Sequence, residues 1–149
     1  MGKPVVRVMR RIGRRIVSVN DVKKIGEKTL LAAGCPRAEL SIVLCDDAFI
    51  RNLNRDFRGQ DQSTDVLSFA MNDGETLNPH PELLGDVVIS LETAQKQAAQ
   101  NGISALEEVA ELIVHGVLHL LGYDHEKRGD AACMTKEAKR IHAVIKSSL

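Results

Sequence analysis

Aromatic residues are scarce in this chain of 149 residues, which has three phenylalanines, one tyrosine and no tryptophan. A surface that binds single strands by stacking bases on aromatic side chains is therefore hard to assemble. Positive and negative charges balance, with 20 Lys and Arg against 20 Asp and Glu, so net charge alone would not draw the chain to polyanions. Any contact with a nucleic acid would then depend mainly on local contacts with phosphate.

Paired cysteines and long apolar runs are also missing. Cys35, Cys45 and Cys133 are widely separated and lack the spacing of a zinc ribbon or a redox dithiol. We expect reduced, buried thiols and a cytoplasmic location. The basic first 19 residues contain no apolar run long enough for a signal peptide or a membrane span, so we expect no membrane partner.

The neutral total conceals an uneven distribution of charge along the chain. The first 60 residues hold 13 of the 20 basic residues but only 6 of the 20 acidic ones. Two interpretations stay open: a solvated edge strand that charge protects from aggregation, or a local basic surface for a polyanion. The first fifteen positions alone contain six bases: Lys3, Arg7, Arg10, Arg11, Arg14 and Arg15.

Hydrophobic periodicity predicts a single α+β domain over residues 1–149, α/β-like in character, with a small mixed four-stranded sheet packed with about five helices. The loop Asn72–Leu84 is long enough to suggest a functional role. Short apolar runs predict strand material at Val5–Met9, Ile12–Val17, Leu40–Cys45, Asp65–Met71 and Asp86–Leu91. Helical spacing and capping signals predict helices at Val19–Ala33, from Asp46 and Asp47 to Gly59, and at Leu91–Gln100, Ala105–Leu121 and Asp130–Ser147.

Three of the five histidines lie close together in the segment HGVLHLLGYDH, residues 115–125. His115 and His119 project from the same face of a helix, where both imidazoles could bind one metal ion. Gly122 favours a helix end just after them, and the chain could then turn back to bring in His125 as a third ligand. Three ligands leave a fourth position open, as catalytic zinc sites do, and zinc lowers the pKa of a bound water to about 7.

The spacing of these histidines, with a glycine before the third, matches the metal site of metzincin peptidases. In that motif a glutamate follows the first histidine and acts as general base, whereas this chain has Gly116. The metal-binding pattern is therefore present without its usual base. Peptide hydrolysis is disfavoured, although a metallopeptidase-like hydrolase that uses another base stays an alternative.

The same segment resembles the signature of the YbeY family of bacterial endoribonucleases, which act in ribosomal RNA maturation and ribosome quality control. Two further segments are similar to that family: NRDFRGQDQSTDVLSFAM, residues 54–71, and LLGDVVIS, residues 83–90. Ser63 and Ala70 depart from the family, whose members often have proline there. Together with the order of the elements, the resemblance covers most of the chain beyond the first 20 residues.

The resemblance implies that His115, His119 and His125 hold one zinc ion per chain and that Arg58 faces the active cleft. The residues alone leave Arg58 open: its guanidinium could bind a phosphate in bidentate fashion, or it could be an ordinary exposed or carboxylate-paired arginine. Asp124 could orient a histidine or the water at the metal, or it could be only a turn residue. Arg58 and Asp124 are the predicted catalytic residues.

These observations together predict a zinc-dependent, single-strand-specific endoribonuclease that acts in 16S rRNA 3′-end maturation and ribosome quality control. Its expected partners are single-stranded ribosomal RNA and the small ribosomal subunit with its proteins, and no DNA partner is expected. The proton acceptor stays open among a hydroxide on the metal, Asp124 and a route through the RNA 2′-hydroxyl. A ribosome-assembly factor with a structural zinc is an alternative from another class.

Overall fold

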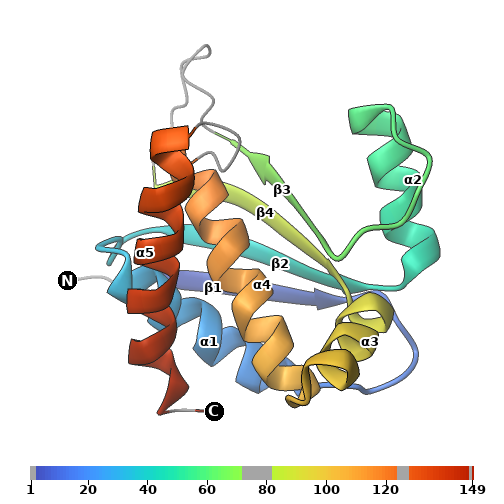
Figure 1. Cartoon of the computed structure of the whole chain (residues 1–149), viewed down its shortest axis with the longest axis horizontal. Coiled ribbons are helices and arrows are strands. Elements are labelled where there is room, and N and C mark those ends of the chain that lie inside the picture. Colours follow the sequence, from blue (N-terminus) through green and yellow to red (C-terminus); the bar gives the residue numbers. More distant parts are fainter. Residues whose placement is uncertain (1–2, 72–81, 124–127, 148) are drawn as a thin grey trace.

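The computed structural model describes residues 3–71, 82–123, 128–147 and 149. Within them, four strands and five helices confirm the predicted α+β class (Figure 1). In chain order the elements are β1 (Val5–Arg10), α1 (Val19–Ala32), β2 (Glu39–Cys45), α2 (Asp47–Arg58), β3 (Val66–Ala70), β4 (Leu83–Ser90), α3 (Leu91–Asn101), α4 (Ala105–Leu120) and α5 (Arg128–Lys146). None of the described helices is long and apolar enough to cross a membrane.

The four strands form one mixed sheet in the order β1-β2-β4-β3. β1 and β4 run parallel to β2, and β3 runs antiparallel to β4. β1 and β3 are therefore the two edge strands. The basic N-terminal segment lies on one of these edges, as the charged-edge interpretation of that segment requires.

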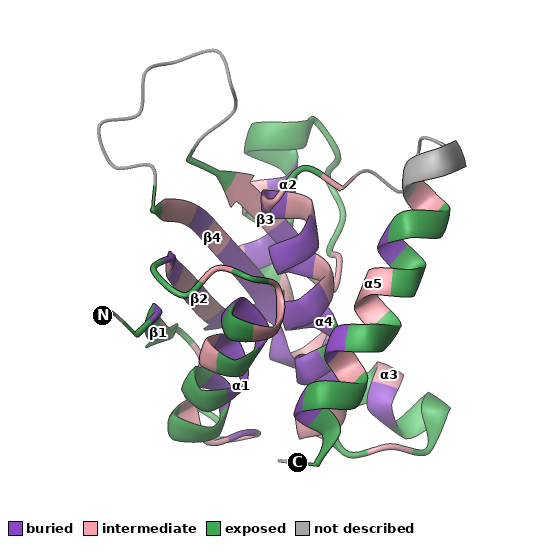
Figure 2. Ribbon diagram, turned by 90° about the vertical axis from the view of Figure 1, so that its left-hand side faces the viewer, coloured by how far each residue is buried: buried purple, intermediate pink, exposed green. Residues whose placement is uncertain are grey.

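The main hydrophobic core lies between one face of the sheet and helices α1, α4 and α5 (Figures 1 and 2). It is aliphatic, as the scarcity of aromatic residues requires. Its fully buried side chains come from several elements and include Leu40 and Ile42 of β2, Val87 of β4, Ile113 of α4 and Ile141 of α5. α4 is buried along most of its length, so the sheet and its neighbouring helices hold it in one orientation.

α2 lies on the opposite face of the sheet and covers a smaller cluster. Cys45, Ile50, Leu67 and Val88 are the buried members of this cluster. The two faces of the sheet therefore differ: α1, α4, α5 and the main core lie on one face, whereas α2 lies on the other, where it contacts β3, β4 and α3. The part of this second face nearest β1 is left without a helix among the described residues.

The expectation of strand material at Ile12–Val17 is wrong. The described residues 11–18 contain bends and no strand. β1 pairs with β2 up to Arg10 opposite Leu44, and β2 ends one residue later, so the following residues have no strand to pair with. Their apolar side chains contact the main core instead. Most of the predicted loop Asn72–Leu84 lies outside the described residues, and β4 begins within its last two positions.

Candidate functional site

α4 begins and ends as its local sequence predicts. The Ser104 hydroxyl caps the first turn by accepting a hydrogen bond from the Glu107 amide at 3.1 Å. The helix ends at Leu120, and Gly122 follows with a φ of 100°, in the left-handed region that favours glycine. The Gly122 amide donates to the His119 carbonyl at 3.0 Å. These hydrogen bonds place His119 in the last turn of α4.

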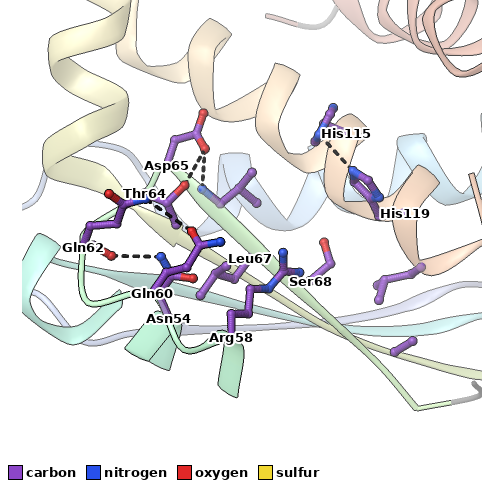
Figure 3. A pocket seen from close by; sticks show the side chains of 13 residues that line it. Asn54, Arg58, Gln60, Gln62, Thr64, Asp65, Leu67, Ser68, His115 and His119 are labelled. Atoms are coloured by element: carbon purple, nitrogen blue, oxygen red, sulfur yellow. Dashed lines mark hydrogen bonds between the residues drawn. The ribbon is translucent and has the colours of Figure 1, made fainter. Parts of the chain in front are cut away.

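His115 and His119 lie next to each other on α4 and point into the same space (Figure 3). Their Nε2 atoms are 3.1 Å apart, and their ring centroids are separated by 4.6 Å. Two nitrogens bound to one tetrahedral zinc ion at about 2.0–2.1 Å lie about 3.3 Å from each other. The two imidazoles thus have the spacing and the ligand type that a shared zinc ion requires.

The predicted third ligand, His125, and the predicted catalytic residue Asp124 lie outside the described residues. Within residues 3–71, 82–123 and 131–147, no group of three His, Cys, Asp or Glu side chains is close enough to hold a metal ion. The donor set that this part of the chain supplies therefore consists of the two imidazoles of α4.

A cavity of about 480 Å³ opens beside the histidine pair (Figure 3). We call it the cleft. Its walls come from the C-terminal half of α2, the segment between α2 and β3, the strand β3 itself, and α4. Its polar lining residues are Asn54, Arg58, Gln60, Gln62, Thr64, Asp65, Ser68, His115 and His119. The cleft therefore joins segments that lie about 50 residues apart in the sequence.

Arg58, the last residue of α2, lies in the cleft across from the histidine pair (Figure 3). Two other arginines of α2 are paired with carboxylates: Arg51 with Asp61 at 2.8 Å and Arg55 with Asp56 at 3.1 Å. No described carboxylate pairs with Arg58 in the same way. Its guanidinium, unlike those of its neighbours, is thus available for an anion that enters the cleft.

Asn54 anchors the turn that follows Arg58. Its side chain is only 3% exposed, and its Nδ2 donates to the Gln62 carbonyl at 2.9 Å. The backbone carbonyl of Asn54 also accepts from the Gln60 amide at 3.2 Å. Gly59 has a φ of 69°, which lets the chain reverse at the end of the helix. These contacts hold the wall of the cleft on the side of Arg58.

The structure explains why this chain has glycine where the metzincin motif has its glutamate. Gly116 faces the sheet, and a Cβ there would lie 2.8 and 2.9 Å from the two methyl carbons of Val87. The Ser68 hydroxyl donates to the Gly116 carbonyl at 3.3 Å, which shows how closely α4 approaches β3. No side chain fits at this position unless α4 moves away from the sheet, so a general base cannot come from it.

Glu108 is an unusual acidic side chain that the sequence patterns did not single out. It is 5% exposed, and its Oε2 has no hydrogen-bond partner among the described residues. Burial raises its pKa above the ordinary value, and the nearby charges of Glu111 and Asp65 raise it further. Glu108 precedes His115 by two helical turns, and this shared face of α4 was the signal in the sequence that could have drawn attention to it.

Some known proteins are similar to this chain in sequence, and solved structures are similar to it in fold. The family described as "Endoribonuclease YbeY" matches residues 10–146. The endoribonuclease YbeY of Geobacter sulfurreducens is 41% identical over 134 residues, which are 90% of this chain and 89% of that protein. The YbeY of Aquifex aeolicus is 48% identical over 124 residues, 83% of this chain and 81% of that protein.

A solution structure from Thermotoga maritima has a similar fold, with a TM-score of 0.61 at 22% sequence identity. The matched region covers 97% of this chain and 93% of that one. At this identity the likeness concerns the fold alone. The family predicted from the three-histidine segment is confirmed by the sequence matches.

Proposed function

The chain belongs to the YbeY endoribonuclease family, and from this we propose that it is a metal-dependent endoribonuclease that cleaves single-stranded RNA in the cleft. One observation carries the proposal: two imidazoles at metal-ligand spacing share the cleft with an arginine that no described carboxylate pairs. A phosphodiester needs cationic groups on both sides because negative charge builds up on its oxygens in the transition state.

We propose that His115, His119 and the predicted third ligand His125 hold one zinc ion. When bound there, the ion would supply Lewis acidity and a water-derived nucleophile at neutral pH. Neutral imidazoles leave the full 2+ charge in the cleft, which suits an anionic substrate. Imidazole nitrogens also bind nickel and copper, so the ligand types alone do not select zinc. Zinc is the ion that we expect from the family resemblance.

Arg58 would bind the non-bridging oxygens of the scissile phosphate. A guanidinium is planar and cationic and offers paired N–H donors, which match the oxygens of a phosphate. Held by the end of α2, it would stabilise the growing charge from the side opposite the histidines. Because position 116 cannot supply a general base, we propose the predicted catalytic residue Asp124, next to His125, as the group that orients a ligand or accepts a proton.

The family resemblance supports a substrate and a setting for this reaction. We propose single-stranded ribosomal RNA near the 3′ end of 16S rRNA as the substrate, in maturation and ribosome quality control. The small ribosomal subunit and its proteins would be the partners, in the cytoplasm. A cleft with one arginine and one metal site would bind a single phosphate, and phosphates are the same at every position of an RNA. Selectivity for the cleavage position would therefore come from contacts elsewhere on the chain or on the ribosome.

The decisive experiment measures zinc content and RNA cleavage in His115→Ala. We expect the wild-type protein to retain about one zinc per chain and the variant to lose both the metal and cleavage of single-stranded ribosomal RNA. His142→Ala on α5 is the matched control, and it should keep both properties. Cleavage that persists in a metal-free variant would point to a contaminating nuclease and would overturn the proposal.

The phosphate role of Arg58 has a separate test. Arg58→Ala should keep its zinc but lose activity by about 10²–10³-fold, the usual effect of removing one charge-stabilising donor. Arg51→Ala on the same helix removes an arginine that is already paired with a carboxylate, and its activity should stay close to that of the wild type. Equal activity of the two variants would remove Arg58 from the mechanism.

Two alternatives predict other results. If the chain is a ribosome-assembly factor with a structural zinc, the zinc-loaded protein should bind small subunits without cleaving their RNA. If it is a metallopeptidase, it should hydrolyse casein and leave RNA intact. The packing of Gly116 against Val87 disfavours the second alternative, because the position of the peptidase base has no room for a side chain.

A further inference from the structure

A second cavity lies on the face of the sheet that the main core does not cover. It has a volume of about 600 Å³ and runs between α2 and the edge strand β1. This volume is within the range of about 300–1,000 Å³ that is typical of ligand sites. We call it the aromatic groove, because Phe49 and Phe57 of α2 and Phe69 of β3 all line it. The mechanism proposed above uses only the cleft and assigns no role to this groove.

The aromatic groove collects every phenylalanine that the chain possesses. The low aromatic content predicted that a stacking surface would be hard to assemble, but the fold gathers the three rings in one place. Phe57 and Phe69 meet edge to face, with ring centroids 5.5 Å apart and planes at 71°. Phe57 is nevertheless 68% exposed. A large aromatic ring left in water beside two others is typical of a binding surface.

Arginines line the same groove. Arg7 belongs to β1, and the guanidinium carbon of Arg11 lies 5.2 Å from the ring centroid of Phe49. Neither arginine pairs with a carboxylate within the described part of the chain. Aromatic rings and arginines in one groove are the combination that binds single strands, because the rings stack on bases while the cations bind phosphates. This distribution of charge favours a polyanion over an apolar peptide.

Asp86 is the only acidic residue among the described residues that line the groove. Burial raises the pKa of its carboxyl. A hydrogen bond from Ser41 lowers that pKa, but its effect is smaller than the effect of burial. The carboxyl lies on β4, in the floor of the groove, whereas Arg7 and Arg11 come from the β1 side. Its oxygens could accept hydrogen bonds from base amino groups, and it does not prevent phosphates from reaching the arginines.

The groove and the cleft are lined by adjacent residues at the end of α2 and along β3. Arg58 lines the cleft, and Phe57, the residue before it, lines the groove. The edge strand β3 forms a wall of both, since Ser68 faces the cleft and Phe69 faces the groove. A strand whose phosphate lies at Arg58 therefore needs only to pass the end of α2 to reach the phenylalanine rings.

We propose that the aromatic groove binds a second segment of the single-stranded RNA, away from the scissile bond. Bases stack on the exposed ring of Phe57 and its neighbours, and phosphates lie at Arg7 and Arg11. The groove lengthens the contact with RNA beyond the single phosphate held in the cleft. This assignment rests on the proposed endoribonuclease function, because it takes the cleft as the place where the same strand is cut.

The first test measures binding of a single-stranded 2′-O-methyl oligonucleotide, which resists cleavage, by fluorescence anisotropy. Phe57→Ala should weaken binding by about 5- to 150-fold, the range for loss of one stacked base. Phe57→Tyr keeps the ring and should bind like the wild type. Leu31→Ala, which removes a side chain of comparable exposure on α1, is the control and should have no effect. Wild-type affinity in Phe57→Ala overturns the proposal.

The second test measures how affinity depends on salt. For single strands, each phosphate contact contributes about 0.7 to the slope of log K against log salt concentration. The double variant Arg7→Gln/Arg11→Gln should therefore lower the slope by about 1.4. Lys23→Gln/Lys24→Gln on α1 removes the same charge elsewhere and should leave the slope unchanged. An equal loss in both double variants would indicate net charge alone and would overturn the proposal.

A protein occupant gives a different outcome. If Phe57→Ala and the arginine double variant keep full RNA affinity but no longer bind a small-subunit protein, the groove is a protein-docking site and the RNA assignment is wrong. A different result would show that the proposed endoribonuclease function is wrong. A wild-type protein that never cleaves RNA removes the catalytic role of the cleft, whereas the binding assays report on the groove without cleavage.

Discussion

Replacing Gly116 with alanine tests how closely α4 is seated on the sheet. The new Cβ would lie 2.8 and 2.9 Å from the two methyl carbons of Val87, whereas carbon atoms normally rest about 3.5–4.0 Å apart. Val87 is fully buried on β4, where close packing leaves its side chain little room to turn away. α4 must therefore lift from the sheet at this point, and it would carry His115 and His119 with it.

Two opposed effects set the change in the free energy of unfolding of Gly116→Ala. Overpacking of a core costs about 1–3 kcal/mol, while the better helix propensity of alanine returns about 0.8–1.0 kcal/mol. We expect Gly116→Ala to lower the free energy of unfolding by about 0–2 kcal/mol. Gly26→Ala on α1 is the control, since its Cβ meets Val6 and Ile42 less closely, at 3.0–3.3 Å. The propensity gain is the same in both, so Gly116→Ala should be the less stable variant.

Urea denaturation measures both free energies of unfolding, and a difference of 1 kcal/mol corresponds to about 2–4 °C in Tm for a chain of this size. Val87→Ala makes room for the new methyl group, so the double variant should be more stable than additivity predicts, by at least about 0.5 kcal/mol. Zinc content should survive, because both histidines move together, whereas cleavage should fall as they shift relative to Arg58. Additive losses, or a Gly116→Ala protein as stable as Gly26→Ala, would refute this account of the packing.

Three further predictions concern buried groups. Burial raises the pKa of Glu108, so the contribution of this carboxyl to stability should be fully present below the ordinary glutamate pKa of about 4.3 and should be lost as pH rises through the raised pKa. The difference in Tm between the wild type and Glu108→Gln should therefore shift against the wild type as pH rises, and parallel Tm curves would contradict it. Burial and the acidic neighbours raise the pKa of Cys45 to about 12, whereas Cys133 is exposed on α5, so the expectation of a buried thiol is wrong there. Iodoacetamide at mildly alkaline pH should therefore alkylate Cys133 and spare Cys45, as mass spectrometry can check. Asn54→Ala leaves the Gln62 carbonyl without its donor and should lower the free energy of unfolding by about 1–3 kcal/mol in urea, with zinc content unchanged.

The wrong prediction of a strand at Ile12–Val17 shows that an apolar run alone does not predict strand pairing. A short apolar run indicates burial, but a strand also needs a partner with free backbone groups. The Arg11 amide still donates to the Leu44 carbonyl at 2.7 Å, but β2 ends at Cys45, so the chain after Arg11 has no strand to pair with. Its apolar side chains pack against the main core from an irregular segment, where Val17 is buried and Ile12 and Ile16 are partly buried.

The sequence by itself determined the elements whose causes are local. The capping serine, the apolar periodicity and the left-handed glycine set the ends of α4, and the four-residue spacing of His115 and His119 put both imidazoles on one face. The same short segment, with two others, was sufficient to identify the family. These inferences succeeded because helix geometry relates residues that are close along the chain.

Only the tertiary structure decided which side chains meet across the sheet. It placed Arg58 opposite the histidine pair, pressed Gly116 against Val87, and gathered three scattered phenylalanines in one groove. These contacts join residues on different elements, and no local period encodes them, because they depend on strand order and on the packing of each helix against the sheet. The scarcity of aromatic residues was visible in the sequence, but their concentration in one place was a property of the fold.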